Sequence, residues 1–104
     1  MAKHRTLSLR RLKPECIQAY RNYHEQVWPE LLDAYDQAGI KWVSCFLEGC
    51  DLVVCIEYDE DVYEESRVAL SHNPVEMRWQ ALMETLRDRS VEQRLFEEVF
   101  CWKS

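Results

Sequence analysis

The alternation of apolar and polar residues predicts the first half of the fold. Residues 4–12 alternate with a period of two, which predicts a half-buried strand. Residues 14–38 predict a long helix, because apolar side chains recur at steps of three and four. Pro29 cannot donate a helical hydrogen bond, so we expect a kink or a short break there. The helical stripe consists of Ile17, Tyr20, His24, Trp28, Leu31 and Tyr35.

The second half of the chain adds three strands and a further helical region. Residues 40–47 and 52–58 predict two strands joined by a turn at residues 48–51. A helical region opens at the acidic residues 59–65, breaks at 71–74 and continues over about 75–88. The alternating residues 95–102 predict the last strand. Within the strand 40–47, one face should carry Trp42, Ser44 and Phe46, and the other Val43, Cys45 and Leu47.

The order strand, helix, strand, strand, helix, strand is that of the ferredoxin-like split βαβ fold. In this α+β fold, a four-stranded antiparallel sheet has its helices on one face. We expect residues 1–104 to form a single domain. The other face of the sheet would be bare and would carry several aromatic residues. Two sheets packed face to face would cover it, so the sequence predicts a homodimer in the form of a dimeric α+β barrel.

Composition excludes several classes of partner and cofactor. The formal charge is −6 and no basic face is predicted, so nucleic acid is not an expected partner. No apolar run approaches the length of a membrane helix, so no membrane association is expected. The five cysteines show no Cys-x-x-Cys pair and are interpreted as reduced thiols of a cytoplasmic protein, with only Cys50 expected to be exposed. We expect no metal site.

The candidate chemistry lies on the helical stripe. Tyr20 and His24 should point inward, one turn apart, beside the turn disturbed by Pro29. An imidazole can act as acid or base near neutral pH, which makes His24 the candidate catalytic residue. The pattern alone leaves open that His24 and Tyr20 are hydrogen-bonded core residues, and that Trp79 is a core residue too.

Four segments of the chain resemble the L-rhamnose mutarotases, a family of small dimeric α+β barrel proteins. The order of predicted elements also agrees, so the resemblance covers nearly the whole chain. The first two segments, which adjoin each other, are the more specific. The four are Tyr20-x-x-x-His24, Val27-Trp28-Pro29-Glu30-Leu31, Met77-Arg78-Trp79-x-x-x-Met83 and Glu97-Glu98-Val99-Phe100.

The resemblance implies a reaction and roles for three residues. Proteins of this family interconvert the α and β anomers of a 6-deoxy-L-sugar, a monosaccharide substrate, and mutarotation requires no cofactor. By resemblance, His24 is the proton donor, Tyr20 contacts the sugar, and Trp79 lines the sugar pocket. We therefore expect an isomerase of carbohydrate metabolism.

Two departures from the family pattern bear on the identity of the sugar. The family commonly has a Trp-Trp pair where this chain has Trp79-Gln80. It also has a sugar-binding tyrosine in the second strand, where this chain has Val43 with Trp42 beside it. We therefore add Trp42 and Gln80 to the candidate sugar contacts, and we consider L-fucose as well as L-rhamnose as the substrate.

Two other functions are compatible with the same fold class. Dimeric α+β barrels include haem-binding and monooxygenase-like proteins, in which an inward histidine such as His24 can be an axial ligand. A non-catalytic sugar-binding module is the other alternative, because a fold does not fix a function.

Overall fold

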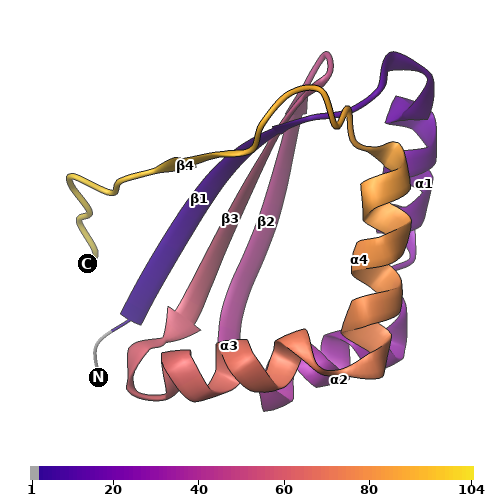
Figure 1. Cartoon of the computed structure of the whole chain (residues 1–104). Helices are drawn as coiled ribbons and strands as arrows, with labels where there is room; N and C mark the ends of the chain where they lie inside the picture. Colours follow the sequence, from indigo (N-terminus) through magenta and orange to yellow (C-terminus); the bar gives the residue numbers. More distant parts are fainter. Residues whose placement is uncertain (1–2) are drawn as a thin grey trace.

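The computed structural model describes residues 3–104 and has one antiparallel sheet with the strand order β2–β3–β1–β4 (Figure 1). Its strands are β1 (Lys3–Arg11), β2 (Ile40–Glu48), β3 (Asp51–Asp59) and β4 (Arg94–Phe96). The helices lie on one side of the sheet and are α1 (Ile17–Glu25), α2 (Pro29–Gln37), α3 (Tyr63–Ser71) and α4 (Pro74–Leu86). Short 3-10 turns, Pro14–Cys16 and Glu60–Val62, precede α1 and α3. The predicted ferredoxin-like α+β fold is confirmed.

The predicted long helix is two helices of nine residues each, α1 and α2. Residues 26–28 separate them, and Trp28 has the extended backbone (φ −56°, ψ 126°) that a following proline favours. Pro29 then opens α2, a position where its missing N–H leaves no hydrogen bond unmade. The expected break is confirmed, and it turns the chain so that α1 and α2 run in different directions (Figure 1).

Cross-strand pairing gives each face of the sheet its own set of side chains. Residues directly opposite each other on neighbouring strands share a face. Val43 pairs with Ile56 and Cys45 with Val54 on the face toward the helices. The opposite, open face carries the pairs Trp42–Glu57, Ser44–Cys55 and Phe46–Val53. The predicted alternation in the second strand is therefore confirmed, and the exposed fraction of both Trp42 and Phe46 is 60%.

The core lies between the sheet and the helices. Leu12, Leu52 and Val54 from the sheet side meet Tyr20 and Leu86 from the helices, and all five are buried. Burying such side chains stabilises the fold by roughly 1.5–3 kcal/mol for each large aliphatic group. The core therefore fixes α1 and α4 against the sheet. These two helices carry most of the candidate site residues.

Gly39 makes the tight connection between α2 and β2. Its φ is +79°, a left-handed conformation that glycine adopts at low cost. A Cβ at this position would lie 2.9 Å from Cγ2 of Val62, closer than ordinary van der Waals contact. The glycine is therefore required both by its backbone angle and by the close approach of Val62.

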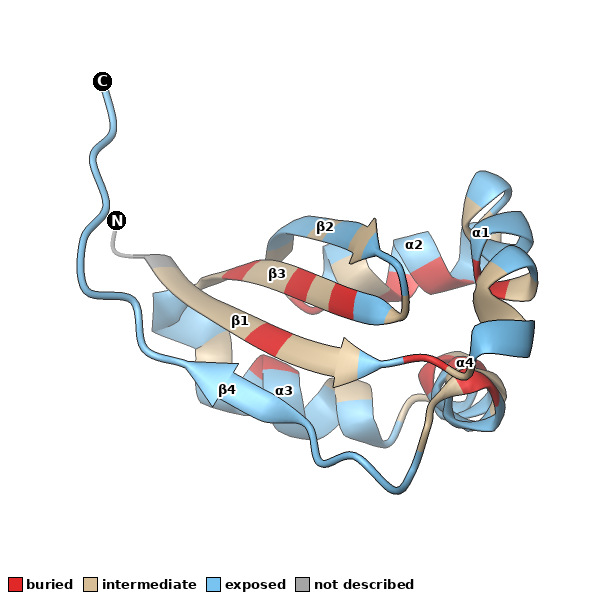
Figure 2. Ribbon diagram, turned by 90° about the horizontal axis from the view of Figure 1, so that it is seen from above, coloured by how far each residue is buried: buried red, intermediate tan, exposed pale blue. Residues whose placement is uncertain are grey.

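The last strand is shorter than the sequence predicts. A strand was expected over 95–102, but β4 covers only Arg94–Phe96 and pairs with Leu7–Leu9 of β1. The following segment (residues 97–104, the tail) is exposed along its whole length (Figure 2). An alternating sequence forms a strand only where a neighbouring strand offers hydrogen bonds, and β1 offers them to three residues.

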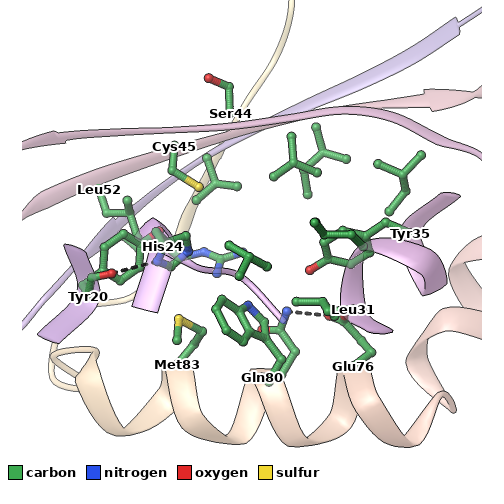
Figure 3. Close-up of a pocket in the computed structure, with 18 of the residues that line it drawn as sticks. Tyr20, His24, Leu31, Tyr35, Ser44, Cys45, Leu52, Glu76, Gln80 and Met83 are labelled. Carbon is green, nitrogen blue, oxygen red and sulfur yellow. Dashed lines mark hydrogen bonds between the residues drawn. The ribbon is translucent and has the colours of Figure 1, made fainter. Parts of the chain in front are cut away.

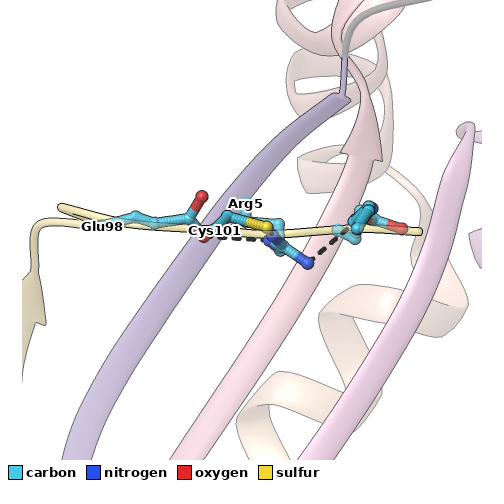
Figure 4. Close-up of polar contacts among 5 residues, drawn as sticks. Arg5, Glu98 and Cys101 are labelled. Carbon is cyan, nitrogen blue, oxygen red and sulfur yellow. Dashed lines mark hydrogen bonds and ion pairs between the residues drawn. The ribbon is translucent and has the colours of Figure 1, made fainter.

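Ion pairs connect the tail to the open face of the sheet (Figure 4). Arg5 of β1 binds Glu98 with 2.9 Å between Nε and Oε2, and Lys103 binds Glu57 of β3 with 2.7 Å between Nζ and Oε1. Arg5 also contacts Sγ of Cys101 and pairs with Glu57 at 3.5 Å. These contacts hold the polar side chains of the tail, whereas its apolar side chains remain exposed.

All five cysteines, which lie within the described residues, are free thiols. The expectation that Cys50 alone would be exposed is wrong, because Cys50 is half-buried while Cys45 and Cys101 are exposed. Cys45 lies on the edge strand β2 and Cys101 on the tail, two places at the margin of the fold. Within residues 3–104, no helix has the length and apolar character needed to cross a membrane.

Candidate active site

A cavity of about 620 Å³ lies between the sheet and the helices α1, α2 and α4 (Figure 3). Its size falls within the range of small-molecule sites. The sheet contributes mostly apolar side chains such as Val54 and Ile56. The helices contribute most of the rings and polar groups, namely Tyr20, His24, Tyr35, Glu76, Trp79 and Gln80.

His24 lies in the last turn of α1 and is half-buried. Its Nδ1 is 2.8 Å from the backbone carbonyl oxygen of Tyr20, one turn earlier on the same helix (Figure 3). A carbonyl oxygen can only accept a hydrogen bond, so Nδ1 carries the proton in this contact. Nε2 is therefore the nitrogen that can exchange a proton with a ligand.

Aromatic rings hold the imidazole from two sides. Tyr20 stacks on His24 with 4.0 Å between ring centroids and an angle of 25° between the planes. Trp79 of α4 meets the imidazole edge-on at 5.3 Å, and Trp28 meets Trp79 edge-on at 5.0 Å. Such contacts restrict the ring orientations available to His24, so Nε2 keeps a fixed position.

Tyr20 is a buried phenol with an exposed fraction of 6%. Burial raises the pKa of its hydroxyl, and contact with Cys45 raises that pKa further. The hydroxyl therefore stays protonated at physiological pH. It can donate a hydrogen bond to a ligand oxygen, but it is poorly suited to act as a general base.

Glu76 adds a buried carboxyl group that the sequence interpretation did not include. It lies in the first turn of α4 with an exposed fraction of 7%. Nε2 of Gln80 donates a hydrogen bond of 2.6 Å to Oε1 of Glu76 (Figure 3). Burial raises the pKa of Glu76, although interactions with Gln80 and Tyr35 act in the opposite direction. The charge of Glu76 contributes, after burial itself, to raising the pKa of Tyr35.

The structure brings together four of the five candidate residues named from the sequence. Tyr20, His24, Trp79 and Gln80 all line the cavity. Trp42 does not, because it lies on the open face of the sheet opposite Glu57. Trp42 is therefore withdrawn as a contact in this cavity.

Several polar lining residues were not among the candidates named from the sequence, and three of them, Arg10, Tyr35 and Glu76, could have been found. For each of the three, the sequence pattern indicates that the side chain faces inward. Arg10 alternates in phase with Ser8 and Leu12, which are both buried. Tyr35 belongs to the apolar stripe of the first helix region. Glu76 precedes Trp79 by three residues and Gln80 by four, which places all three on one side of a helix.

The fold and the cavity together define a class: a ferredoxin-like α+β protein whose pocket presents one imidazole, several aromatic rings and a buried carboxyl group. No cluster of three or more His, Cys, Asp or Glu side chains that could hold a metal ion occurs in the described part of the chain. The profile of the L-rhamnose mutarotases matches residues 5–101. The chain belongs to the L-rhamnose mutarotase family, whose members are isomerases.

Individual relatives agree with this assignment. An L-rhamnose mutarotase of Jannaschia sp. (strain CCS1) is 35% identical over 72 residues, which cover 69% of this chain and 68% of that protein. The crystal structure of an L-rhamnose mutarotase from Formosa agariphila superposes with a TM-score of 0.73, at 23% identity over 96% of this chain and 99% of the other. A NIPSNAP family protein of Agrobacterium tumefaciens shares the fold, with a TM-score of 0.62 at 15% identity over 95% and 89% of the two chains.

Proposed function

We propose that this protein interconverts the α and β anomers of a 6-deoxy-L-hexose, either L-rhamnose or L-fucose. The observation that carries the proposal is the position of His24. Its Nδ1 is occupied by the carbonyl oxygen of Tyr20, while the ring lines a cavity large enough for a small ligand. Family membership supplies the reaction class, and the imidazole supplies a group suited to it.

The chemistry requires two proton movements. A proton must reach the ring oxygen of the sugar, and another must leave the anomeric hydroxyl, before the ring opens. In the proposed mechanism, His24 acts as the imidazolium, in which Nδ1 keeps its proton on the carbonyl oxygen of Tyr20 and Nε2 carries a second one. Nε2 delivers this second proton to the ring oxygen while a solvent water takes the proton of the anomeric hydroxyl. Both protons return by the same routes when the ring closes on the other face of the aldehyde. Tyr20, whose hydroxyl stays protonated, donates a hydrogen bond to a sugar oxygen.

The walls of the cavity suit a pyranose ring. Trp79 is 5% exposed and is braced by Trp28, so its indole is a rigid apolar surface on which sugar C–H groups can pack. Gln80 supplies an amide on the same helix. We therefore assign His24 the catalytic role and Tyr20, Trp79 and Gln80 the substrate-binding roles.

We propose that the working form is a homodimer formed through the open face of the sheet. Phe46 and Trp42 are exposed there, and Phe96 of β4 lies beside Leu7 of β1 on the same face. The tail adds Val99, Phe100 and Trp102, with exposed fractions of 86%, 81% and 74%. Apolar side chains concentrated on one face mark an interaction surface, and a second copy presents a matching one.

We propose the cytoplasm as the location of the protein. Its five cysteines are free thiols, and none of them is paired. Free thiols of this number persist most readily in a reducing compartment.

Saturation-transfer NMR tests the proposed activity directly. The anomeric signals of L-rhamnose and L-fucose are measured with and without the protein at equal pH. We expect the protein to accelerate exchange between the anomers of at least one of the two sugars. Equal exchange rates for both sugars would overturn the proposal. Sugar binding without faster exchange would indicate a binding module, and a Soret band on titration with haem would indicate the haem alternative.

A further inference from the structure

We propose that Glu76, held by Gln80, is the residue that selects the sugar by accepting hydrogen bonds from hydroxyl groups at the end of the ring remote from His24. This inference rests on the proposed mutarotase activity and names a recognition group for the same site. It assigns Glu76 a binding role, whereas the proton transfer stays with His24.

The first observation is that the carboxyl group has spare hydrogen-bonding capacity. Oε1 accepts a hydrogen bond from Gln80, but Oε2 makes no hydrogen bond of ordinary length within residues 3–104, although the hydroxyl of Tyr35 lies near enough to the carboxyl group to lower its pKa. The side chain is nevertheless more than nine-tenths buried and lines the cavity. A buried acceptor without a partner destabilises the protein, so a ligand that donates a hydrogen bond there gains the full interaction.

The second observation is that Arg10 has a buried hydrogen-bond donor without an acceptor. Nε of Arg10 is also buried without a hydrogen-bond partner in the described part of the chain, and Arg10 lines the same cavity. Nε can only donate a hydrogen bond, whereas an ionised carboxylate can only accept. A ligand that satisfies both must present donors and acceptors together. The hydroxyl groups of a neutral sugar do so, because each one donates and accepts.

The third observation is the position of Glu76 relative to the catalytic histidine. Figure 3 shows Tyr20 and His24 at one end of the cavity and Tyr35 and Glu76 at the other. Trp79 contacts His24 and lies one helical turn after Glu76 on α4, so this turn of α4 connects the two ends of the cavity. A pyranose resting on Trp79 with its ring oxygen at His24 would direct its far hydroxyls toward Glu76.

The hydrogen bond from Gln80 orients the carboxyl group for this purpose. With Oε1 occupied, the free oxygen Oε2 keeps a defined position in the cavity. Sugars that differ only in the direction of one hydroxyl then differ in whether that hydroxyl reaches Oε2. A polar group built to bind a hydroxyl discriminates strongly against analogues that lack it, because the group is left buried and unpaired.

Monodeoxy sugars provide the test, because they remove one hydroxyl at a time from the substrate. Anomer exchange is measured by NMR over a range of concentrations for the better 6-deoxy-L-hexose and its 2-, 3- and 4-deoxy analogues. The proteins compared are the wild type, Glu76→Gln, Glu76→Ala and the control Glu65→Gln, which makes the same chemical change at an exposed position of α3. Circular dichroism and thermal melting confirm that each variant is folded.

We expect one deoxy analogue to lose roughly 10- to 100-fold in kcat/KM with the wild type, the range for losing a hydrogen bond to a charged group. Glu76→Gln should show a similar loss with the parent sugar, mainly through a higher KM, and little further loss with that analogue. The isosteric glutamine keeps the variant informative if the alanine variant fails to fold. Glu65→Gln should behave as the wild type.

The outcomes separate this inference from the function on which it rests. If the wild type accelerates anomer exchange and Glu76→Gln has the same KM and the same preference among the deoxy sugars, Glu76 does not select the sugar. A variant whose kcat falls equally for every sugar, with unchanged KM, would also overturn the inference. Absence of exchange with the wild type would instead refute the mutarotase proposal itself.

Discussion

Replacement of His24 by alanine is the most informative perturbation of the proposed reaction. The change removes Nε2, the proposed proton donor, and leaves Tyr20 and Trp79 in place. We expect the rate of anomer exchange to fall by about 100- to 10,000-fold, the usual contribution of a positioned acid–base group. That loss corresponds to roughly 2.7–5.4 kcal/mol in the activation barrier.

The effect on stability should be much smaller than the effect on rate. The variant loses one hydrogen bond, from Nδ1 to the carbonyl oxygen of Tyr20, which contributes about 1 kcal/mol. It also loses ring contacts with Tyr20 and Trp79, each worth about 0.5–1.5 kcal/mol. Because small domains are stable by about 5–15 kcal/mol, we expect His24→Ala to remain folded.

Chemical rescue strengthens the assay. Saturation-transfer NMR gives the exchange rate of the wild type and the variant, and urea denaturation gives their free energies of unfolding. Added imidazole should restore part of the activity of His24→Ala, because the substitution leaves a space beside Trp79 that an imidazole molecule can fill. A folded variant with wild-type exchange rates would refute the acid–base role, and a variant that imidazole cannot rescue would weaken it.

Three further predictions concern the fold, the carboxyl group and the assembly. Gly39→Ala should lower the free energy of unfolding more than Gly49→Ala, since both glycines have positive φ but only Gly39 faces a nearby atom; denaturant titration of both variants measures the difference. The stability of Glu76→Gln relative to the wild type should rise as pH increases above 4.5, because burial raises the pKa of Glu76 and only the wild type loses stability as this group ionises. Denaturant unfolding between about pH 4 and pH 8 measures the difference in free energy of unfolding, and a difference that does not change with pH would contradict the prediction. Phe46→Glu should convert the proposed dimer to a monomer in analytical ultracentrifugation, whereas an unchanged mass would place the interface elsewhere.

Much of the fold follows from local signals in the sequence. The break before Pro29 could be predicted because a proline constrains its own backbone and that of the preceding residue. The length of the last strand could not, since its alternating residues are equally suited to pairing with a strand or to remaining unpaired. Only the structure shows that β1 pairs with Leu95 and Phe96 of this segment and with Arg94 before it.

The site residues on the first helical region could be predicted from the sequence, whereas the orientation of those on the second strand could not. Tyr20 and His24 share a helical stripe, and resemblance to a family gave them roles. In the second strand, alternation required that Trp42 and Val43 face opposite sides, but not which of them faces the helices. That choice depends on an irregularity in the pairing between Ile40 and Trp42, which shifts the register against β3.

Glu76 was missed for a different reason. An acidic residue in a helical region is usually solvated, so its position beside Trp79 and Gln80 was not given weight. Its burial depends on α4 packing against α2 and the sheet, which no local pattern specifies. Arg10 is a similar case, because a charged residue in a half-buried strand can point to either face.

The hydrogen bond between His24 and the main chain of Tyr20 has a consequence for how this site tolerates mutation. The acceptor is a backbone carbonyl, so any residue that keeps α1 helical at position 20 preserves it. Substitutions of the surrounding side chains therefore leave the proton on Nδ1 of His24. The side chains proposed to contact the sugar have no such protection, and on the proposed mechanism their replacement would alter the choice of sugar while Nε2 of His24 stayed in place. A lineage built on this scaffold could therefore acquire new substrates through substitutions on α4 and β1 without passing through an inactive ancestor.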